Sequence, residues 1–250
     1  MLYGRNAVHE ALRAGRRKVR GIWATAATLA GEDWLADRDV QAADGEWLSE
    51  LAGTHDHQGV VLAVTPFRYA ELEELLAAAA AAPADSEGDA PLLLALDEIQ
   101  DPQNLGALAR TAECVGATGL LICRHRAADV TAAAVKASAG AIEHLPVAQV
   151  RNLADALGDA RDAGVWIYGA AGAANGAAGP VPYDRPDYRG PVVLVMGAEG
   201  SGLRPRVASV CDELVALPQR GRIDSLNVSS AAAVLLYEIL QRRERLDKDT

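Results

Sequence analysis

Between residues 218 and 234, small polar residues lead directly into an alanine-rich apolar segment. Ser225 and Asn227 stand just before this segment, which has the composition of a helix. The first N–H groups of a helix lack partners, so backbone donors and polar side chains converge there as a ligand site requires. Two further segments, 97–106 and 196–202, are punctuated by Gly or Asn and also follow apolar runs. Together the three segments predict one composite site.

Short apolar runs predict the strands that would carry these segments. Runs of this length, separated by helical stretches, are typical of parallel strands covered on both faces. Residues from 91 onward are therefore expected to form a doubly wound α/β domain, with a parallel sheet and helices on both faces. Ligands bind such sheets beyond the carboxyl ends of the strands, which places the three segments on one edge. The runs are 92–96, 119–123, 165–168, 192–195 and 213–217.

The preceding residues predict a separate, smaller α/β unit. It has a helix at 6–13 that stops near Gly15, strands at 19–24 and 60–64, and a helix at 47–51. We expect a small domain over 1–67, a helix and mobile acidic Ala-rich linker over 68–90, and the larger domain over 91–250. The glycine-rich stretch 169–179 imitates a phosphate loop, but its repetitive composition favours a flexible surface loop.

Composition narrows the class of protein. The chain has 250 residues, half of them hydrophobic, and a net charge of -10, which disfavours a generic nucleic-acid binder. Residues 1–20 are the exception, because six basic residues stand against one acid; this arm either touches phosphates or is a solvated helix end. Three separated cysteines support neither a disulfide framework nor a zinc site, and no metal is expected. Without a leader or membrane-span pattern, a cytoplasmic protein is expected.

The motifs in these segments are specific in combination. They are Asp101-Pro-Gln-Asn-Leu-Gly-Ala-Leu-Ala-Arg110, Leu194-Val-Met-Gly-Ala-Glu-Gly-Ser-Gly-Leu203 and Leu217-Pro218 with Ser225-Leu-Asn-Val-Ser229. Through them the chain resembles the SpoU (TrmH) family of RNA ribose 2'-O-methyltransferases. Residues 3–8 and 57–61 resemble the small N-terminal substrate-binding domain of its ribosomal-RNA members, which extends the likeness to nearly the whole chain.

The resemblance implies a fold and a cofactor. It implies a C-terminal trefoil knot, which ordinary topology rules would not propose. It also implies S-adenosylmethionine bound in a bent form through backbone groups, contacts that carry over to Gly197, Leu217 and Leu226. Family members form dimers through the knotted domain, and the apolar helix expected at 229–240 would serve as the contact in a homodimer.

Five polar residues are the candidates for catalysis: Asn104, Arg110, Glu199, Ser225 and Asn227. Methyl transfer needs alignment and removal of the hydroxyl proton. A guanidinium stays protonated, so we expect Arg110 to hold a phosphate or the reacting hydroxyl rather than to act as the base. Glu199 would position Arg110 or accept the proton, while the other three would hold the loops and orient substrate. As alternatives, Asn104, Ser225 and Asn227 could cap helices and Glu199 could be solvated.

The resemblance implies methylation of structured RNA, most of all a guanosine in large-subunit ribosomal RNA. A transfer-RNA methyltransferase and a non-catalytic ribosomal-RNA-binding protein stay open as alternatives. Because the chain is acidic, RNA must meet local positive regions, and Arg5, Arg13, Arg220 and Arg222 are the expected contacts, with Arg124 and Arg126 beside them. His57 and His144 are expected to be structural.

Overall fold

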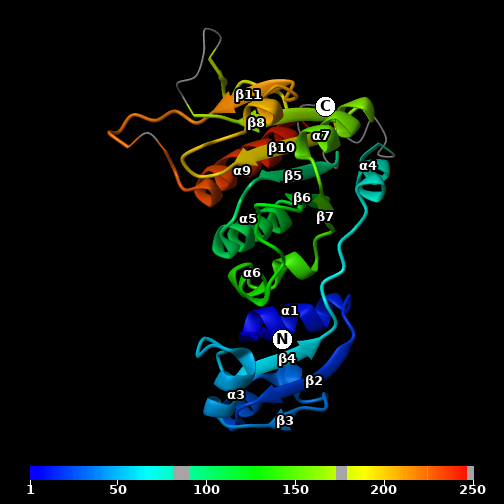
Figure 1. Cartoon of the computed structure of the whole chain (residues 1–250), viewed down its shortest axis with the longest axis vertical. Helices are drawn as coiled ribbons and strands as arrows, with labels where there is room; N and C mark the ends of the chain where they lie inside the picture. The colour runs from blue at the N-terminus through cyan, green and yellow to red at the C-terminus, as the bar shows by residue number, and fades with distance from the viewer. Residues whose placement is uncertain (81–89, 173–178, 224, 247–250) are drawn as a thin grey trace.

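The computed structural model describes residues 1–80, 90–172, 179–223 and 225–246 and contains two sheets (Figure 1). The four-stranded sheet lies at the end of the molecule formed by the N-terminal residues, and the seven-stranded sheet forms the other end. The linker expected after the alanine run, and most of the glycine-rich stretch 169–179, lie outside the described residues. No helix in these ranges is long and apolar enough to cross a membrane.

The small sheet has the order β1-β4-β2-β3. Its strands are β1 (Leu2–Tyr3), β2 (Val19–Ala24), β3 (Gln41–Ala42) and β4 (Val60–Val64). β4 pairs antiparallel with both β1 and β2, and β3 joins β2 in parallel. The helices of this part are α1 (Arg5–Ala14), α2 (Ala26–Gly31) and α3 (Gly45–Ala52), with a 3-10 turn η1 at Asp33–Leu35. The expected bounds of β2 and β4 are confirmed, and α1 ends at Gly15 in the left-handed conformation.

Every strand pair in the large sheet is parallel, in the order β7-β6-β5-β10-β8-β11-β9. The strands are β5 (Leu92–Asp97), β6 (Gly119–Cys123), β7 (Val147–Val150), β8 (Trp166–Ala170), β9 (Val181–Pro182), β10 (Val192–Gly197) and β11 (Glu213–Ala216). The five predicted runs are β5, β6, β8, β10 and β11. β7 and β9 were missed, because β9 has two residues and β7 places the polar Gln149 among its apolar residues.

Helices cover both faces of this sheet, as the continuous apolar strands predict. On one face Leu94 and Leu96 pack with α5 (Pro102–Cys114) and α9 (Val228–Leu246). On the other face Leu93 and Ala95 pack with α4 (Leu72–Ala80), α7 (Leu153–Asp162) and α8 (Pro205–Ala208). The parallel α/β architecture is thus confirmed; the threading of the C-terminal segment through a knot stays a prediction.

The two sheets are joined through α1, α6 (Ala132–Ala137) and the 3-10 turn η2 (Ala141–Glu143) (Figure 1). Arg17 Nη2 donates to Glu143 Oε1 at 2.5 Å, and both side chains are almost fully buried. Arg16 donates to the carbonyl oxygen of Leu145 at 2.9 Å, and His144 Nε2 lies 2.7 Å from Glu10 Oε2. Two cations of the basic N-terminal arm, Arg16 and Arg17, therefore bind a carbonyl and a carboxylate of the protein's own chain, which neither alternative for this arm includes.

Candidate functional site

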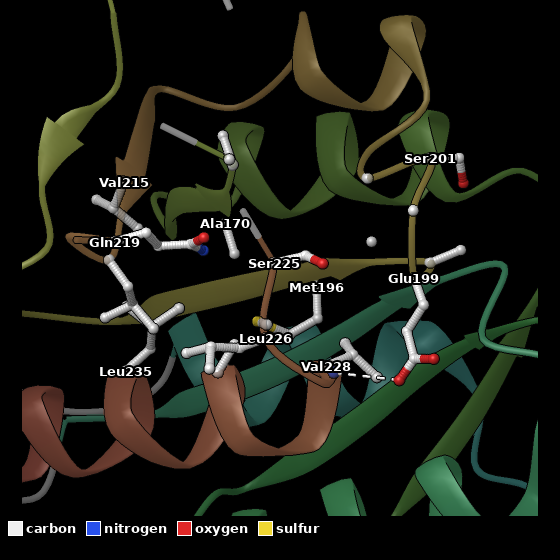
Figure 2. A pocket seen from close by; sticks show the side chains of 18 of the residues that line it. Ala170, Met196, Glu199, Ser201, Val215, Gln219, Ser225, Leu226, Val228 and Leu235 are labelled. Carbon is white, nitrogen blue, oxygen red and sulfur yellow. Dashed lines mark hydrogen bonds between the residues drawn. The ribbon is translucent and has the colours of Figure 1, made fainter. Parts of the chain in front are cut away.

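The site is a pocket of about 520 Å³ beyond the carboxyl ends of β8, β10 and β11. Each of the three expected strand-to-loop segments meets at this edge, although residues 97–106 contribute beside the cavity rather than to its lining. A pocket of this size falls in the range of roughly 300–1,000 Å³ that small-molecule and cofactor sites occupy. Gly197, Leu217, Ser225 and Leu226 all line it. Figure 2 shows Ser225 and Leu226 at the cavity.

Three of the predicted polar residues form one hydrogen-bonded cluster at the rim. Asn227 Nδ2 donates to Glu199 Oε1 at 2.6 Å and to Asn104 Oδ1 at 3.0 Å. Asn104 Nδ2 also donates to Glu199 Oε1, at 3.2 Å. The three residues come from α5, the loop after β10 and the start of α9, so the cluster ties together all three motifs.

Asn227 has two functions in this cluster. Its Oδ1 accepts from the backbone N–H groups of Ser229 at 2.9 Å and Ser230 at 3.3 Å, so it caps α9. Its Nδ2 remains free to bind Glu199 and Asn104. The capping role considered for Asn227 is therefore real, but it accompanies a role in the site.

Asn104 does not cap its helix, because Asp101 does. The Asp101 carboxylate accepts from the Gln103 N–H at 3.0 Å, and Pro102 opens α5. Asn104 therefore lies within the first turn of α5, where its side chain is directed to Glu199 and Asn227. The helix begins earlier than a loop over 97–106 predicts, because Asp-Pro is itself a helix-start signal.

Glu199 is bound by Asn104 and Asn227 rather than by Arg110, and its side chain remains exposed to solvent. Its Oε1 accepts three N–H groups, the third from the Val228 backbone at 3.4 Å (Figure 2). The arrangement therefore fixes the direction of this carboxylate at one end of the pocket.

At two positions in the motifs, Gly106 and Gly197, neighbouring parts of the chain leave no room for a side chain. A Cβ on Gly197 would lie 2.2 Å from the Gly202 carbonyl carbon, because the loop after β10 folds back on its own strand. A Cβ on Gly106 would lie 2.4 Å from the Ala137 Cβ, so this glycine lets α5 and α6 pack closely. The close approach expected at Gly197 is thus made by the protein's own loop, which in turn shapes the pocket wall.

Arg110, Ser225, Arg220 and Arg222 are exposed. Arg110 lies in the second half of α5, six residues beyond Asn104, and Ser225 lines the pocket. Arg220 and Arg222 belong to the segment that follows β11 and leads to α9. These three guanidinium groups and one hydroxyl are therefore accessible to a large ligand.

The other expected RNA contacts are Arg5 and Arg13 in the small domain and Arg126 after β6, and each is paired with a carboxylate. Arg5 pairs with Glu32 at 3.2 Å, and Arg13 pairs with Glu10 at 3.0 Å. Both guanidinium groups remain about half exposed or more, so they can still meet a phosphate. Arg126 is likewise paired, with Glu98 at 3.1 Å.

Sequence reasoning missed Asp97 and Arg204. The buried Asp97 carboxylate ends β5 and accepts from the Arg204 backbone N–H at 2.8 Å and from its Nε at 2.7 Å. Burial acts to lower the pKa of Arg204, but the hydrogen bond and charge of Asp97 outweigh burial, and the pKa is raised. This pair anchors the loop 198–204 to β5. The sequence signal that could have identified this pair is Asp97, an acidic residue directly after the apolar run 92–96.

The pocket lining suits a cofactor held through backbone groups and apolar contacts. Leu217, Leu226, Met196 and Val215 form much of its wall, and glycines supply exposed backbone. These features fit S-adenosylmethionine, whose flat adenine ring needs apolar contact on its faces. Over the part of the chain that the structure describes, no group of three His, Cys, Asp or Glu side chains is placed to hold a metal ion.

Comparison with known proteins agrees with this geometry. Residues 91–237 match the SpoU rRNA Methylase family, and residues 1–70 match the family described as RNA 2'-O ribose methyltransferase substrate binding. YacO of Bacillus subtilis (strain 168), whose name places it among TrmH family tRNA/rRNA methyltransferases, is 38% identical over 96% of this chain and 94% of its own. The 23S rRNA (guanosine-2'-O-)-methyltransferase RlmB of Pseudomonas syringae pv. tomato is 36% identical over 97% and 95%. An AdoMet-bound rRNA methyltransferase from Sinorhizobium meliloti superposes with a TM-score of 0.74 at 28% identity, over 96% of this chain and 85% of that one.

Proposed function

Because the chain belongs to the SpoU rRNA methylase family, and is thus an S-adenosylmethionine-dependent RNA methyltransferase, we propose that it methylates a ribose 2'-oxygen of a guanosine in 23S ribosomal RNA. The observation that carries the site assignment is the cluster of Asn104, Glu199 and Asn227, in which three motifs meet at the rim of the pocket. The guanosine and the ribosomal RNA are supported by the likeness to RlmB and by the family match of residues 1–70.

The cofactor supplies an activated methyl group on a sulfonium, so the protein's task is to align the 2'-oxygen with it and to remove the hydroxyl proton. Glu199 places its carboxylate at the end of the pocket where a cation is stabilised by opposite charge. Asn104 and Asn227 fix this carboxylate, because each donates an N–H to the same oxygen. Ser225 presents a hydroxyl at the mouth, where the ribose would enter.

Arg110 is the clamp for the target nucleotide. Its guanidinium is exposed on α5, the helix that also carries Asn104, so both groups share one rigid element. A permanently charged, planar donor binds a phosphate in a fixed orientation and stabilises negative charge that develops on the attacking oxygen. Arg220 and Arg222 would hold neighbouring phosphates, and Arg5 and Arg13 more distant ones.

The substrate is tested by transfer of labelled methyl from S-adenosylmethionine to RNA that lacks its native modifications, followed by nucleoside analysis of each RNA size class. We expect label in 2'-O-methylguanosine of the large ribosomal RNA. Label in transfer RNA would keep the chemistry and overturn the substrate; the name of YacO, which includes both RNA classes, favours this as the second candidate. Cofactor binding without transfer to any RNA would favour a binding protein.

The role of Arg110 is tested by Arg110→Ala. Methyl transfer should fall at least about a hundredfold, as for loss of a group that stabilises developing charge, while cofactor affinity stays within about twofold. Arg161→Ala is the matched control, because Arg161 is also exposed near the end of a helix but lies on α7, on the opposite face of the sheet. Unchanged turnover in Arg110→Ala would refute the assignment.

The proposal includes a homodimer. Val234 and Tyr237 lie three residues apart on α9 and are 43% and 44% exposed, so they form an apolar strip on a helix beside the site. A second copy of the chain would cover this strip through a twofold contact. Light scattering should give twice the chain mass for the wild type and the monomer mass for Tyr237→Lys; a monomeric wild type would refute the dimer.

A further inference from the structure

Gln219 is a polar side chain at an apolar end of the pocket. It stands three residues after β11, and its neighbours in the lining include Ala170, Val215 and Leu235. Figure 2 shows the carboxamide of Gln219 directed from the wall toward the cavity, at the end away from Glu199. The roles assigned above do not use this side chain.

The carboxamide of Gln219 has an unmet hydrogen-bonding requirement. Its Oε1 is shielded from water and has no hydrogen-bond partner within the described ranges. A buried polar atom without a partner loses its hydration and gains nothing in return, so folded proteins rarely retain one outside a functional site. Because the last side-chain bond of glutamine rotates over a broad range, the carboxamide can turn its oxygen or nitrogen toward a group in the cavity.

The two ends of the pocket suit different parts of the cofactor. The carboxylate of Glu199 suits the sulfonium, because the two charges are opposite. The Gln219 end, with Val215 and Leu235, suits a flat heterocycle that needs apolar contact on its faces and a few polar partners at its edge. The adenine of the cofactor therefore belongs at the Gln219 end.

We propose that Gln219 recognises this adenine, with its amide oxygen accepting from the exocyclic amino group and its amide nitrogen donating to a ring nitrogen. A glutamine carboxamide offers one acceptor and two donors in a plane, and this pattern is complementary to an adenine edge. Gln219 thus makes the site selective for adenine, beyond the backbone contacts expected at Leu217 and Leu226. The inference rests on the proposed cofactor position in this pocket.

The test uses two probes that differ in one group: S-adenosylhomocysteine and the same compound with hydrogen in place of the 6-amino group. Calorimetry of the full chain should show that the wild type binds the amino compound about three- to tenfold more tightly, as expected for one hydrogen bond. Gln219→Met keeps the length and apolar volume of the side chain but removes the amide. Its affinities for the two probes should be equal within about twofold.

The matched control is Ile223→Ala, which removes an apolar side chain, 75% exposed, from the same lining. It should lower the affinity for both probes by the same factor and leave the ratio of the two affinities unchanged. A wild type that binds both probes equally would overturn the role of Gln219 while leaving the cofactor site intact, and so would a Gln219→Met variant that keeps the wild-type ratio. A wild type that binds neither probe would overturn the cofactor site itself. Gln219→Leu takes the place of Gln219→Met if that variant does not fold, and a Gln219→Leu variant that keeps the wild-type ratio would likewise overturn the role of Gln219.

Discussion

Replacing Arg17 with Met should destabilise the contact between the two sheets more than any exposed charge substitution. Arg17 joins the segment before β2 to η2, and its side chain is 7% exposed while that of Glu143 is fully buried. Its guanidinium also lies over the Phe67 ring, 4.9 Å from the centroid. Methionine keeps much of the apolar stem but removes the charge, so Glu143 is left buried without its cation.

The free energy of unfolding should fall by about 3–5 kcal/mol at neutral pH, the usual cost of removing one partner of a buried ion pair. The lost cation–π contact contributes about 0.5–2 kcal/mol of this. Arg13→Met is the control: Arg13 precedes Arg17 by four residues, is 63% exposed and pairs with Glu10, so its loss should cost at most about 1 kcal/mol.

The stability difference between wild type and Arg17→Met should increase as pH rises. Burial raises the pKa of Glu143, and the charge and hydrogen bond of Arg17 oppose that rise. Without Arg17 the pKa should rise further. A carboxyl whose folded-state pKa is raised favours folding below its unfolded pKa, and this contribution is lost as pH rises through the folded value. The difference between wild type and Arg17→Met should therefore be smallest below about pH 4 and largest near neutrality.

Urea unfolding of wild type and Arg17→Met across this pH range measures the difference. A second variant, Arg17→Met with Glu143→Leu, removes the stranded carboxyl and should recover most of the loss, because apolar replacements of buried ion pairs are often neutral or stabilising. A pH-independent difference, or a double variant no more stable than Arg17→Met, would refute the reasoning.

Three further predictions concern the site and its support. Gly106→Ala should lower the free energy of unfolding by about 1–3 kcal/mol in urea, because the new Cβ meets Ala137 at 2.4 Å; no change would refute the α5–α6 packing. Asn227→Ser keeps a cap for α9 but cannot reach Glu199 with an amide, so thermal unfolding should change little while methyl transfer falls at least about tenfold; full activity would remove Asn227 from the site. A chain lacking residues 1–67 should retain cofactor affinity in calorimetry and lose RNA affinity; loss of cofactor binding would show that the two parts do not fold separately.

Much of the fold could be predicted because apolar periodicity reports local burial. The runs at 119–123 and 192–195 became β6 and the core of β10, and their unbroken apolar character correctly indicated a parallel sheet with two covered faces. Very short strands such as β1 and β3 could not be predicted, since two residues carry no periodicity and pair only because a neighbouring strand is present.

The candidate site, like the fold, could be predicted from the sequence only in part. The sequence alone determined the motifs, the strand-following position of each and the residue types available for chemistry, because these depend on the local order of residues. Only the tertiary structure decided that Glu199 binds Asn104 and Asn227, 95 and 28 positions away, rather than Arg110. It also decided that Arg17 binds Glu143, 126 positions away, and that Gln219 lines the pocket. Such pairings depend on β10 lying between β5 and β8, and strand order is set by the packing of the whole chain.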